Sequence, residues 1–197
     1  MKLALLALTA ALAAAPNADA QSSSNSAPVQ QPASPSPSAP DPFRGVPAAR
    51  PDDVKSVDSL LTALYDVISG PAGERDWNRF RSLFMPNARL TSAEKTLDGA
   101  VRVRPSSVED YVRLGGSYFL KNGFFEKPII SRVETFGNVA QVFSSYESRH
   151  APDETPFARG INSLQMLYDG KRWWVVNILW DEERPDNPLP KDFRTRP

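Results

Sequence analysis

The 197-residue chain contains no cysteine. Disulfide bonds are therefore excluded, and so is the lipid-bearing cysteine of a bacterial lipoprotein. The chain also has a single histidine, His150, which together with the absence of cysteine argues against a zinc site. The sequence predicts no metal and no cofactor, and the stability of the folded part must come from its core.

An excess of charge is lacking as well, because 23 Lys and Arg residues balance 23 Asp and Glu residues. Such a balance leaves no electrostatic footprint for nucleic acid or anionic lipid. The sequence also lacks a Gly-x-Ser-x-Gly elbow, a phosphate loop and a dinucleotide fingerprint. We therefore expect neither nucleic acid nor a membrane as a partner of the mature protein.

Long apolar runs are absent except for one, which extends from Leu3 to Ala15 with Thr9 as its sole interruption. It follows Lys2 and is shorter than the about 20 residues that a membrane-spanning helix needs. Ala18-Asp19-Ala20 then has the small-x-small pattern of a cleavage site. These features predict a signal peptide over residues 1–20 and a periplasmic or secreted mature protein.

Residues 21–50 are rich in Ser, Pro, Gln and Ala and show no apolar periodicity. A segment of this composition cannot bury enough apolar surface to offset the entropy lost on ordering, so we expect a disordered linker. The remaining residues, 51–197, have the usual size of one domain.

Three helices are expected in the first half of this domain. Apolar residues at helical spacing predict the first over about residues 55–69 and the second over about residues 74–84. The third opens at Ser106-Ser107-Val108-Glu109, which has the spacing of a capping box. Gly115-Gly116 within it predicts a kink or a close backbone approach.

Strands dominate the rest of the domain. Two short ones are expected at residues 88–91 and 99–104, and four longer ones follow as two hairpins that turn at Gly137-Asn138 and Asp169-Gly170. A two-residue turn at Asp169-Gly170 would set Tyr168 opposite Lys171. Asn162 would then lie opposite Asn177.

This order of elements resembles the nuclear-transport-factor-2-like superfamily, and within it the exported SnoaL-like branch. The resemblance covers roughly Ser56–Phe193 and is carried by Asp76-Trp77, Leu83-Phe84-Met85-Pro86-Asn87-Ala88, Arg159–Gln165, Asp169–Asn177, Trp180 and Glu183. It implies an α+β fold of cystatin-like architecture, in which a strongly curved antiparallel sheet wraps around three N-terminal helices and leaves a cone-shaped cavity. Fold resemblance of this kind implies no particular chemistry.

Both faces of the hairpin within about Gly160–Trp180 are largely apolar, unlike the alternating pattern of a sheet with one solvated face. One face can cover the cavity, and the other then needs a partner. Because a two-fold contact between identical chains is the commonest solution, the sequence predicts a homodimer through this sheet.

Burial in the upstream hairpin places Tyr146, Ser148 and His150 on the cavity side. His150 is the candidate general base, although a solvent-exposed position at the strand end is the simpler interpretation. Asn162 and Asn177 would either bond to each other or direct their amides at a ligand. The residues predicted to bind a ligand are Trp77, Tyr118, Tyr146, His150, Asn162 and Asn177.

Two classes of function stay open. The first is an exported binding or scaffold domain that holds a small apolar or aromatic molecule, or none, without catalysis. The second is a lyase or isomerase acting on a small cyclic or polyketide-like substrate, because the resemblance implies relatives such as ketosteroid isomerases and dehydratases. None of their catalytic sets can be matched residue by residue, so the sequence favours the first class and predicts no catalytic residue beyond the candidate His150.

Overall fold

The computed structural model describes residues 41–96 and 98–194. The predicted signal peptide and the predicted linker up to residue 40 lie outside the described residues. Residues 41–50 already contact the domain, since the ring of Phe43 stacks on Trp174 with centroids 4.5 Å apart. Arg50 Nη2 likewise donates to Asp76 Oδ2 at 3.0 Å. The folded part therefore begins before residue 51.

The helices of the described chain are short, and none of them is both long and apolar enough to cross a membrane. They are α1 (Pro51–Val54), α2 (Val57–Ile68), α3 (Trp77–Ser82), α4 (Val108–Phe119) and the 3-10 turn η1 (Lys191–Phe193). The capping box of α4 joins Ser107 to Asp110 and not Ser106 to Glu109. Glu109 is free for another partner because it lies outside the cap, and it binds Arg81 at 2.6 Å.

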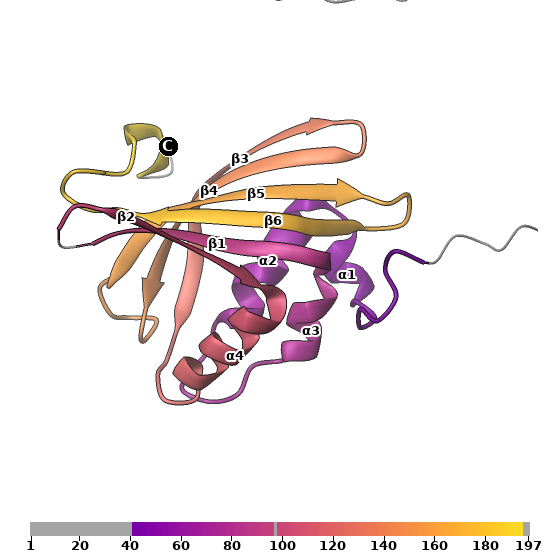
Figure 1. Cartoon of the computed structure of the whole chain (residues 1–197), viewed down its shortest axis with the longest axis horizontal. Helices are drawn as coiled ribbons and strands as arrows, with labels where there is room; N and C mark the ends of the chain where they lie inside the picture. Colours follow the sequence, from indigo (N-terminus) through magenta and orange to yellow (C-terminus); the bar gives the residue numbers. More distant parts are fainter. Residues whose placement is uncertain (1–40, 97, 195–197) are drawn as a thin grey trace, which may run out of the picture. The chain divides into compact units, whose positions relative to one another are not determined.

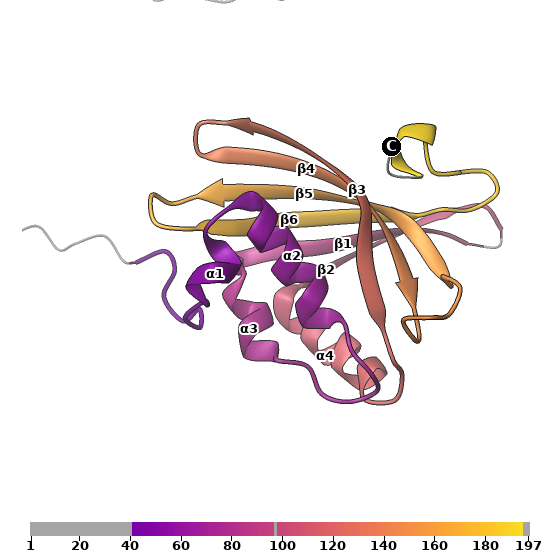
Figure 2. The same cartoon turned by 180° about the vertical axis from the view of Figure 1, so that it is seen from behind.

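Six strands form one sheet in the order β2-β1-β6-β5-β4-β3. They are β1 (Phe84–Lys95), β2 (Val101–Ser107), β3 (Phe125–Phe136), β4 (Val139–Arg149), β5 (Ala158–Tyr168) and β6 (Trp173–Glu182). All neighbours are antiparallel except β1 and β6, which run parallel. Figures 1 and 2 show α2, α3 and α4 on one side of the curved sheet and η1 on the other. The predicted α+β fold is confirmed, with β1 and β2 longer than expected.

The core lies between α2 and the sheet. Leu60 and Leu83 are fully buried, and Val142 and Val175 meet them from the strands. α4 runs without interruption through Gly115 and Gly116, and the ring of Trp77 lies beside Gly116. The two glycines thus accompany close packing and not a kink.

The two hairpins differ in how well their turns could be predicted. Phe136 pairs with Val139 across Gly137-Asn138, as predicted. In the second hairpin, by contrast, Tyr168 pairs with Trp173 across a four-residue loop, residues 169–172. The Asp169 carboxylate organises this loop, because its Oδ1 accepts the backbone N–H groups of Lys171 and Arg172, both at 2.8 Å.

A bulge between Gln165 and Met166 shifts the second hairpin by one further residue. Asn162 therefore pairs with Trp180, while Asn177 pairs with Gln165. The predicted pairing of Asn162 with Asn177 is wrong. Successive side chains of a strand alternate between faces, so Asn177 points away from the side to which Ile178 and Trp180 point.

Candidate functional site

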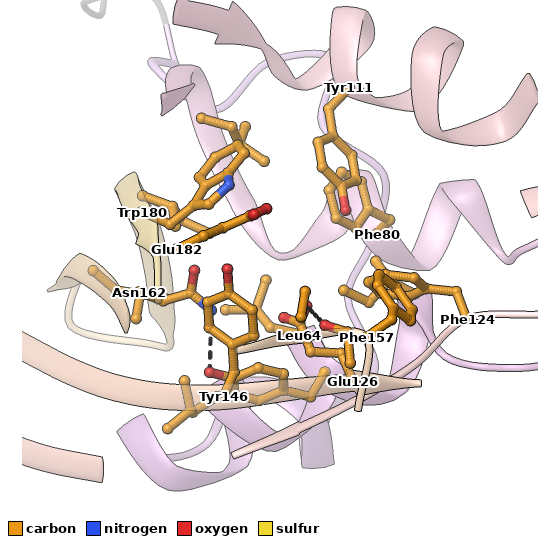
Figure 3. Close-up of a pocket in the computed structure, with 18 residues that line it drawn as sticks. Leu64, Phe80, Tyr111, Phe124, Glu126, Tyr146, Phe157, Asn162, Trp180 and Glu182 are labelled. Carbon is orange, nitrogen blue, oxygen red and sulfur yellow. Dashed lines mark hydrogen bonds between the residues drawn. The ribbon is translucent and has the colours of Figure 1, made fainter. Parts of the chain in front are cut away.

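A cavity of about 240 Å³ lies between the helices and the sheet (Figure 3). Its wall is largely apolar and aromatic, with contributions from α2, α3, α4 and every strand except β2. The polar side chains that border it are Tyr65, Tyr111, Glu126, Tyr146, Ser148, Asn162 and Glu182. No Lys, Arg or His of the described residues belongs to this lining. The described lining thus combines apolar walls with two carboxylic acids and no basic side chain.

Glu126, the second residue of β3, is held firmly in the wall. Its backbone N–H donates to Ser69 Oγ at 3.0 Å, and its carboxylate Oε2 accepts the Ser148 hydroxyl at 2.8 Å. Burial raises the pKa of Glu126, hydrogen bonds from Ser148 and Asn162 lower it, and the charge of the nearby Glu182 raises it. The net pKa is about 7. Glu126 keeps some accessible surface because it borders the cavity, but protein surrounds its carboxyl closely.

Tyr65 connects α2 to the sheet through a chain of hydrogen bonds. Its hydroxyl lies 2.8 Å from Ser144 Oγ and accepts the Asn162 side-chain N–H at 3.2 Å. This contact fixes the orientation of the Asn162 amide at the cavity wall. Burial, and next the charge of Glu126, raises the pKa of Tyr65 well above its ordinary value, so the hydroxyl stays protonated.

Two further tyrosines bring hydroxyl groups to the cavity. Tyr146 is 4% exposed, yet its hydroxyl makes no hydrogen bond with any residue that the structure describes. Figure 3 shows Tyr111 reaching toward the cavity from α4, on the side of the cavity opposite Glu126. Burial raises the pKa of both tyrosines. Each is therefore a neutral hydrogen-bond donor within reach of a bound molecule.

Gly160 makes room for Tyr146. A Cβ at this position would lie 2.7 Å from the Tyr146 hydroxyl and 2.4 Å from the carbonyl oxygen of Asp181. Both distances are too short for real contacts, so a side chain here would displace either the tyrosine or the strand. The glycine is thus part of the arrangement that holds the Tyr146 hydroxyl in place.

Glu182 supplies a second carboxyl at the end of β6. Figure 3 shows it beside Trp180, with its carboxyl directed at the cavity. Burial raises the pKa of Glu182, and the negative charges of Glu94 and Asp181 raise it further. Two carboxyl groups with raised pKa values therefore face one space.

The structure brings two of the six predicted ligand-binding residues to this cavity, Tyr146 and Asn162. Their role in binding stays a prediction. The cavity position expected for Asn177 is corrected, because the longer loop and the bulge turn it to the outer face of the sheet, the face opposite the helices. Tyr118 is also outside the cavity lining and is 40% exposed on α4.

Trp77 and His150 are the other two corrections. Trp77 packs between Phe80 and Phe119, with ring centroids 5.7 and 6.0 Å away, because α3 lies against α4 there. His150 is exposed just beyond β4, as the simpler interpretation had it. Its ring stacks on Phe157 at 4.2 Å, and its Nδ1 lies 3.1 Å from the carbonyl oxygen of Gly123. Phe157 lines the cavity and His150 does not, so the histidine contacts a residue of the cavity wall without lining the cavity itself.

Four polar residues of the cavity were not predicted from the sequence: Glu126, Glu182, Tyr65 and Tyr111. One signal for Glu126 was present: it is an acid that follows Phe124 and Phe125 and precedes Pro128-Ile129-Ile130 after a single lysine. An acid embedded in such an apolar run is expensive to bury unless it has a purpose. No comparable local signal marks the other three.

Comparison with known proteins supports the fold. The sequence matches no protein-family model and no curated protein sequence. Among solved structures it resembles a suspected dehydratase of the NTF2-like family from Streptomyces avermitilis, with a TM-score of 0.51, 11% identity, and coverage of 67% of this chain and 96% of that one. A cystatin-like protein of unknown function from Nostoc punctiforme has a TM-score of 0.50, 13% identity, and coverage of 68% and 92%.

An NTF2-like protein of unknown function from Silicibacter pomeroyi is also similar, with a TM-score of 0.46, 14% identity, and coverage of 66% of this chain and 94% of that one. The structures with TM-scores of 0.50 and 0.51 confirm, at the level of the fold, the resemblance predicted from the sequence: the described domain has the NTF2-like, cystatin-like architecture. At these identities the comparisons assign no reaction.

Proposed function

We propose that the cavity is the active site of a proton-transfer enzyme, an isomerase or dehydratase acting on a small, largely apolar cyclic molecule, with Glu126 as the base. The observation that carries this proposal is the Glu126 carboxyl itself. It lies in a largely apolar cavity without a Lys, Arg or His in the described lining, and its pKa is about 7. A base is most effective when its pKa lies near the working pH.

The neighbouring groups suit such a reaction. Glu126 would remove a proton from the carbon next to a carbonyl group of the substrate. The negative charge that develops on the carbonyl oxygen would accept a hydrogen bond from the neutral hydroxyl of Tyr146. The protonated Glu126 would then return the proton to another carbon, which completes an isomerisation, or to a departing hydroxyl group, which completes a dehydration. Neither route consumes a further reactant.

The size of the cavity restricts the substrate. Its volume of about 240 Å³ is below the roughly 300–1,000 Å³ of pockets for drug-sized ligands. Phe80 and Tyr111, whose rings stack with centroids 5.1 Å apart, and Trp180 provide flat apolar walls. A molecule with one ring, or two small ones, fits these dimensions.

Binding without catalysis is the second candidate. The observation in its favour is that the Glu126 carboxyl accepts its hydrogen bond from Ser148, a neutral hydroxyl. This neighbour is not an acid or base that could exchange protons with Glu126. In this case Glu126 would only hold a polar group of the ligand. The two candidates use the same cavity and differ in whether a proton moves.

Hydrogen–deuterium exchange separates the two candidates. We expect the protein to accelerate exchange of the α-protons of cyclohexanone with D2O, measured by proton NMR. Because general base catalysis contributes about 10²–10⁴-fold, Glu126→Gln should lower the enzymatic rate by about that factor. Tyr146→Phe should lower it as well, since the oxyanion loses its donor.

Glu134→Gln is the matched control, because Glu134 lies on the same strand but is exposed and outside the cavity. Its exchange rate should equal that of the wild type. A wild-type rate no higher than that of an equal concentration of acetate would contradict the proposal. Binding of cyclohexanone without exchange, seen as saturation transfer from the protein, would establish the second candidate instead.

Export and assembly remain part of the proposal. Export is tested by the intact mass of protein from an exported fraction, which should lack residues 1–20.

Assembly concerns the outer face of the sheet. Exposed Val103 and Leu179 border a groove on this face, and the chain's own C-terminal segment covers part of it, with Phe193 on Phe143. We propose that a second copy covers the rest. Light scattering that gives a monomer at tens of micromolar would contradict this.

A further inference from the structure

The acids at the end of β6 are unequally paired. Asp181 is bound by Arg184 at 2.6 Å, and Glu183 is bound by Arg159 at 2.5 Å. Glu182 between them, which faces the cavity, takes part in no ion pair with any residue that the structure describes, although its carboxyl lies among other negative charges. Each neighbour of Glu182 thus has an arginine as its ion-pair partner, whereas the cavity-facing Glu182 has no such partner among the described residues.

Glu126 has the same property. Within residues 41–96 and 98–194 it forms no ion pair, and the groups that face it are Tyr65 from α2, Tyr111 from α4, Tyr146 and Ser148 from β4, Asn162 from β5 and Glu182 from β6. All of these groups are neutral or negative. Ionising both acids therefore places two negative charges at one cavity. Arg184 offsets part of the charge of Glu182, but this arginine is paired with Asp181 and lies outside the cavity lining.

Aromatic side chains surround these acids. The rings of Tyr65, Phe80, Tyr111, Phe124, Tyr146, Phe157 and Trp180 border the cavity. The face of an aromatic ring attracts a cation, and Trp does so most strongly. A cavity built from rings and unpaired carboxyl groups favours a positive ligand and disfavours an anion.

We propose that the ligand of this cavity is a small organic cation, a protonated amine whose ammonium group pairs with Glu182 beside the ring of Trp180. The rest of the molecule extends toward Glu126. This inference rests on the proposed function in that it names the substrate class for the same site.

The Tyr146 hydroxyl supports a ligand in this place independently of the acids. Tyr146 is more than nine-tenths buried, lines the cavity, and makes no hydrogen bond with the described residues. A polar group on so buried a side chain normally has a partner, and an N–H group of the ligand would supply one. An inorganic cation is a poorer fit, because the described residues contain no group of three or more His, Cys, Asp or Glu side chains that could hold a metal.

Three probes of similar shape and different charge test the inference with the full mature chain. At pH 8 we expect benzylamine, which is protonated, to bind at least about tenfold more tightly than benzyl alcohol by isothermal titration calorimetry. Benzoate should bind most weakly of the three. Calorimetry at pH 7 in two buffers of different ionisation enthalpy should also show that benzylamine binding releases protons, since the ammonium favours ionised carboxyl groups.

Glu182→Gln should reduce the preference for benzylamine over benzyl alcohol to about twofold or less, while the affinity for benzyl alcohol stays within about twofold. Glu134→Gln, on the exposed part of β3, should keep the full preference. Benzyl alcohol as the internal reference also reports whether a variant is still folded around its cavity.

Equal affinity of the wild type for benzylamine and benzyl alcohol would overturn the inference. So would a preference that survives in Glu182→Gln, or no binding of any of the three probes. The proposed function is judged separately by the exchange of cyclohexanone and its loss in Glu126→Gln. If the protein exchanges the α-protons of cyclohexanone but shows no preference for benzylamine, the proposed enzymatic function is retained and only the proposed substrate class is rejected.

Discussion

Replacing Glu126 with glutamine should raise the free energy of unfolding by about 3 kcal/mol at pH 8.5 and leave it nearly unchanged at pH 4. The pKa of this carboxyl is about 7 in the folded protein and 4.5 at its ordinary value. At about 1.4 kcal/mol for each pH unit, this difference corresponds to roughly 3 kcal/mol. Glutamine fills the same space and can still accept the Ser148 hydroxyl, so the change removes the charge alone.

The direction follows from which state releases its proton first. Between pH 4.5 and 7 the unfolded chain ionises at this position while the folded protein holds the proton, so the wild type loses stability as the pH rises. Above pH 7 both states are ionised and the deficit is constant. Urea unfolding followed by tryptophan fluorescence at pH 4, 5.5, 7 and 8.5 gives the difference between variant and wild type, in which the other titrating groups cancel.

Glu134→Gln serves as the control again and should differ from the wild type by less than about 0.5 kcal/mol at every pH, as an exposed surface substitution does. A stability difference for Glu126→Gln that does not change with pH would show that the carboxyl titrates normally. The proposed base would then lose its physical support. A variant that gains stability and loses proton exchange would display the trade-off between stability and activity expected at a catalytic site.

The comparison of the two hairpins shows what the sequence could predict and why. Gly137-Asn138 supports a tight turn through backbone conformation alone, and its register was predicted correctly. Asp169-Gly170 has an equally strong turn pattern, but the Asp169 side chain captures two backbone N–H groups and the indole N–H of Trp174, which stabilises a four-residue loop. A side chain that competes for backbone partners is not visible in hydrophobic periodicity.

The candidate site was harder to predict for a related reason. Tyr146 follows from the strand alternation of the correctly paired first hairpin, whereas Glu126 requires knowing that three helices and three more strands close around it. From the sequence, His150 was only the candidate base, because histidine is the residue type that ordinarily titrates near neutral pH. In the folded protein, burial gives that range to a glutamate. Such a shift is a property of the surroundings and not of the residue.

Replacing Arg79 with methionine should lower the free energy of unfolding at pH 7 by about 3–5 kcal/mol, because it leaves a buried charge without its partner. Arg79 Nε and Nη2 bind the two carboxylate oxygens of Asp53 at 2.7 and 2.9 Å, and Nη1 binds Asp66 at 2.5 Å. The side chains of Arg79 and Asp53 are only 15% and 11% exposed. One guanidinium thus joins α3 to α1 and α2, and both α2 and α3 line the cavity.

Arg81→Met is the matched control, since Arg81 lies two residues further in the same helix and binds Glu109 at 2.6 and 2.8 Å. Glu109 is 65% exposed, so this loss should stay below about 1 kcal/mol. Combining Arg79→Met with Asp53→Leu should recover most of the stability, because the unpaired buried carboxylate is then removed as well.

The hydrogen bond from Arg79 holds the pKa of Asp53 below its ordinary value. This stabilisation is present above pH 4 and is lost as the pH falls through the folded pKa, so the deficit of Arg79→Met should shrink toward pH 3. Urea unfolding at pH 7 and pH 3 measures both effects, and a loss at pH 7 no larger than that of Arg81→Met would contradict the assignment of a buried ion pair.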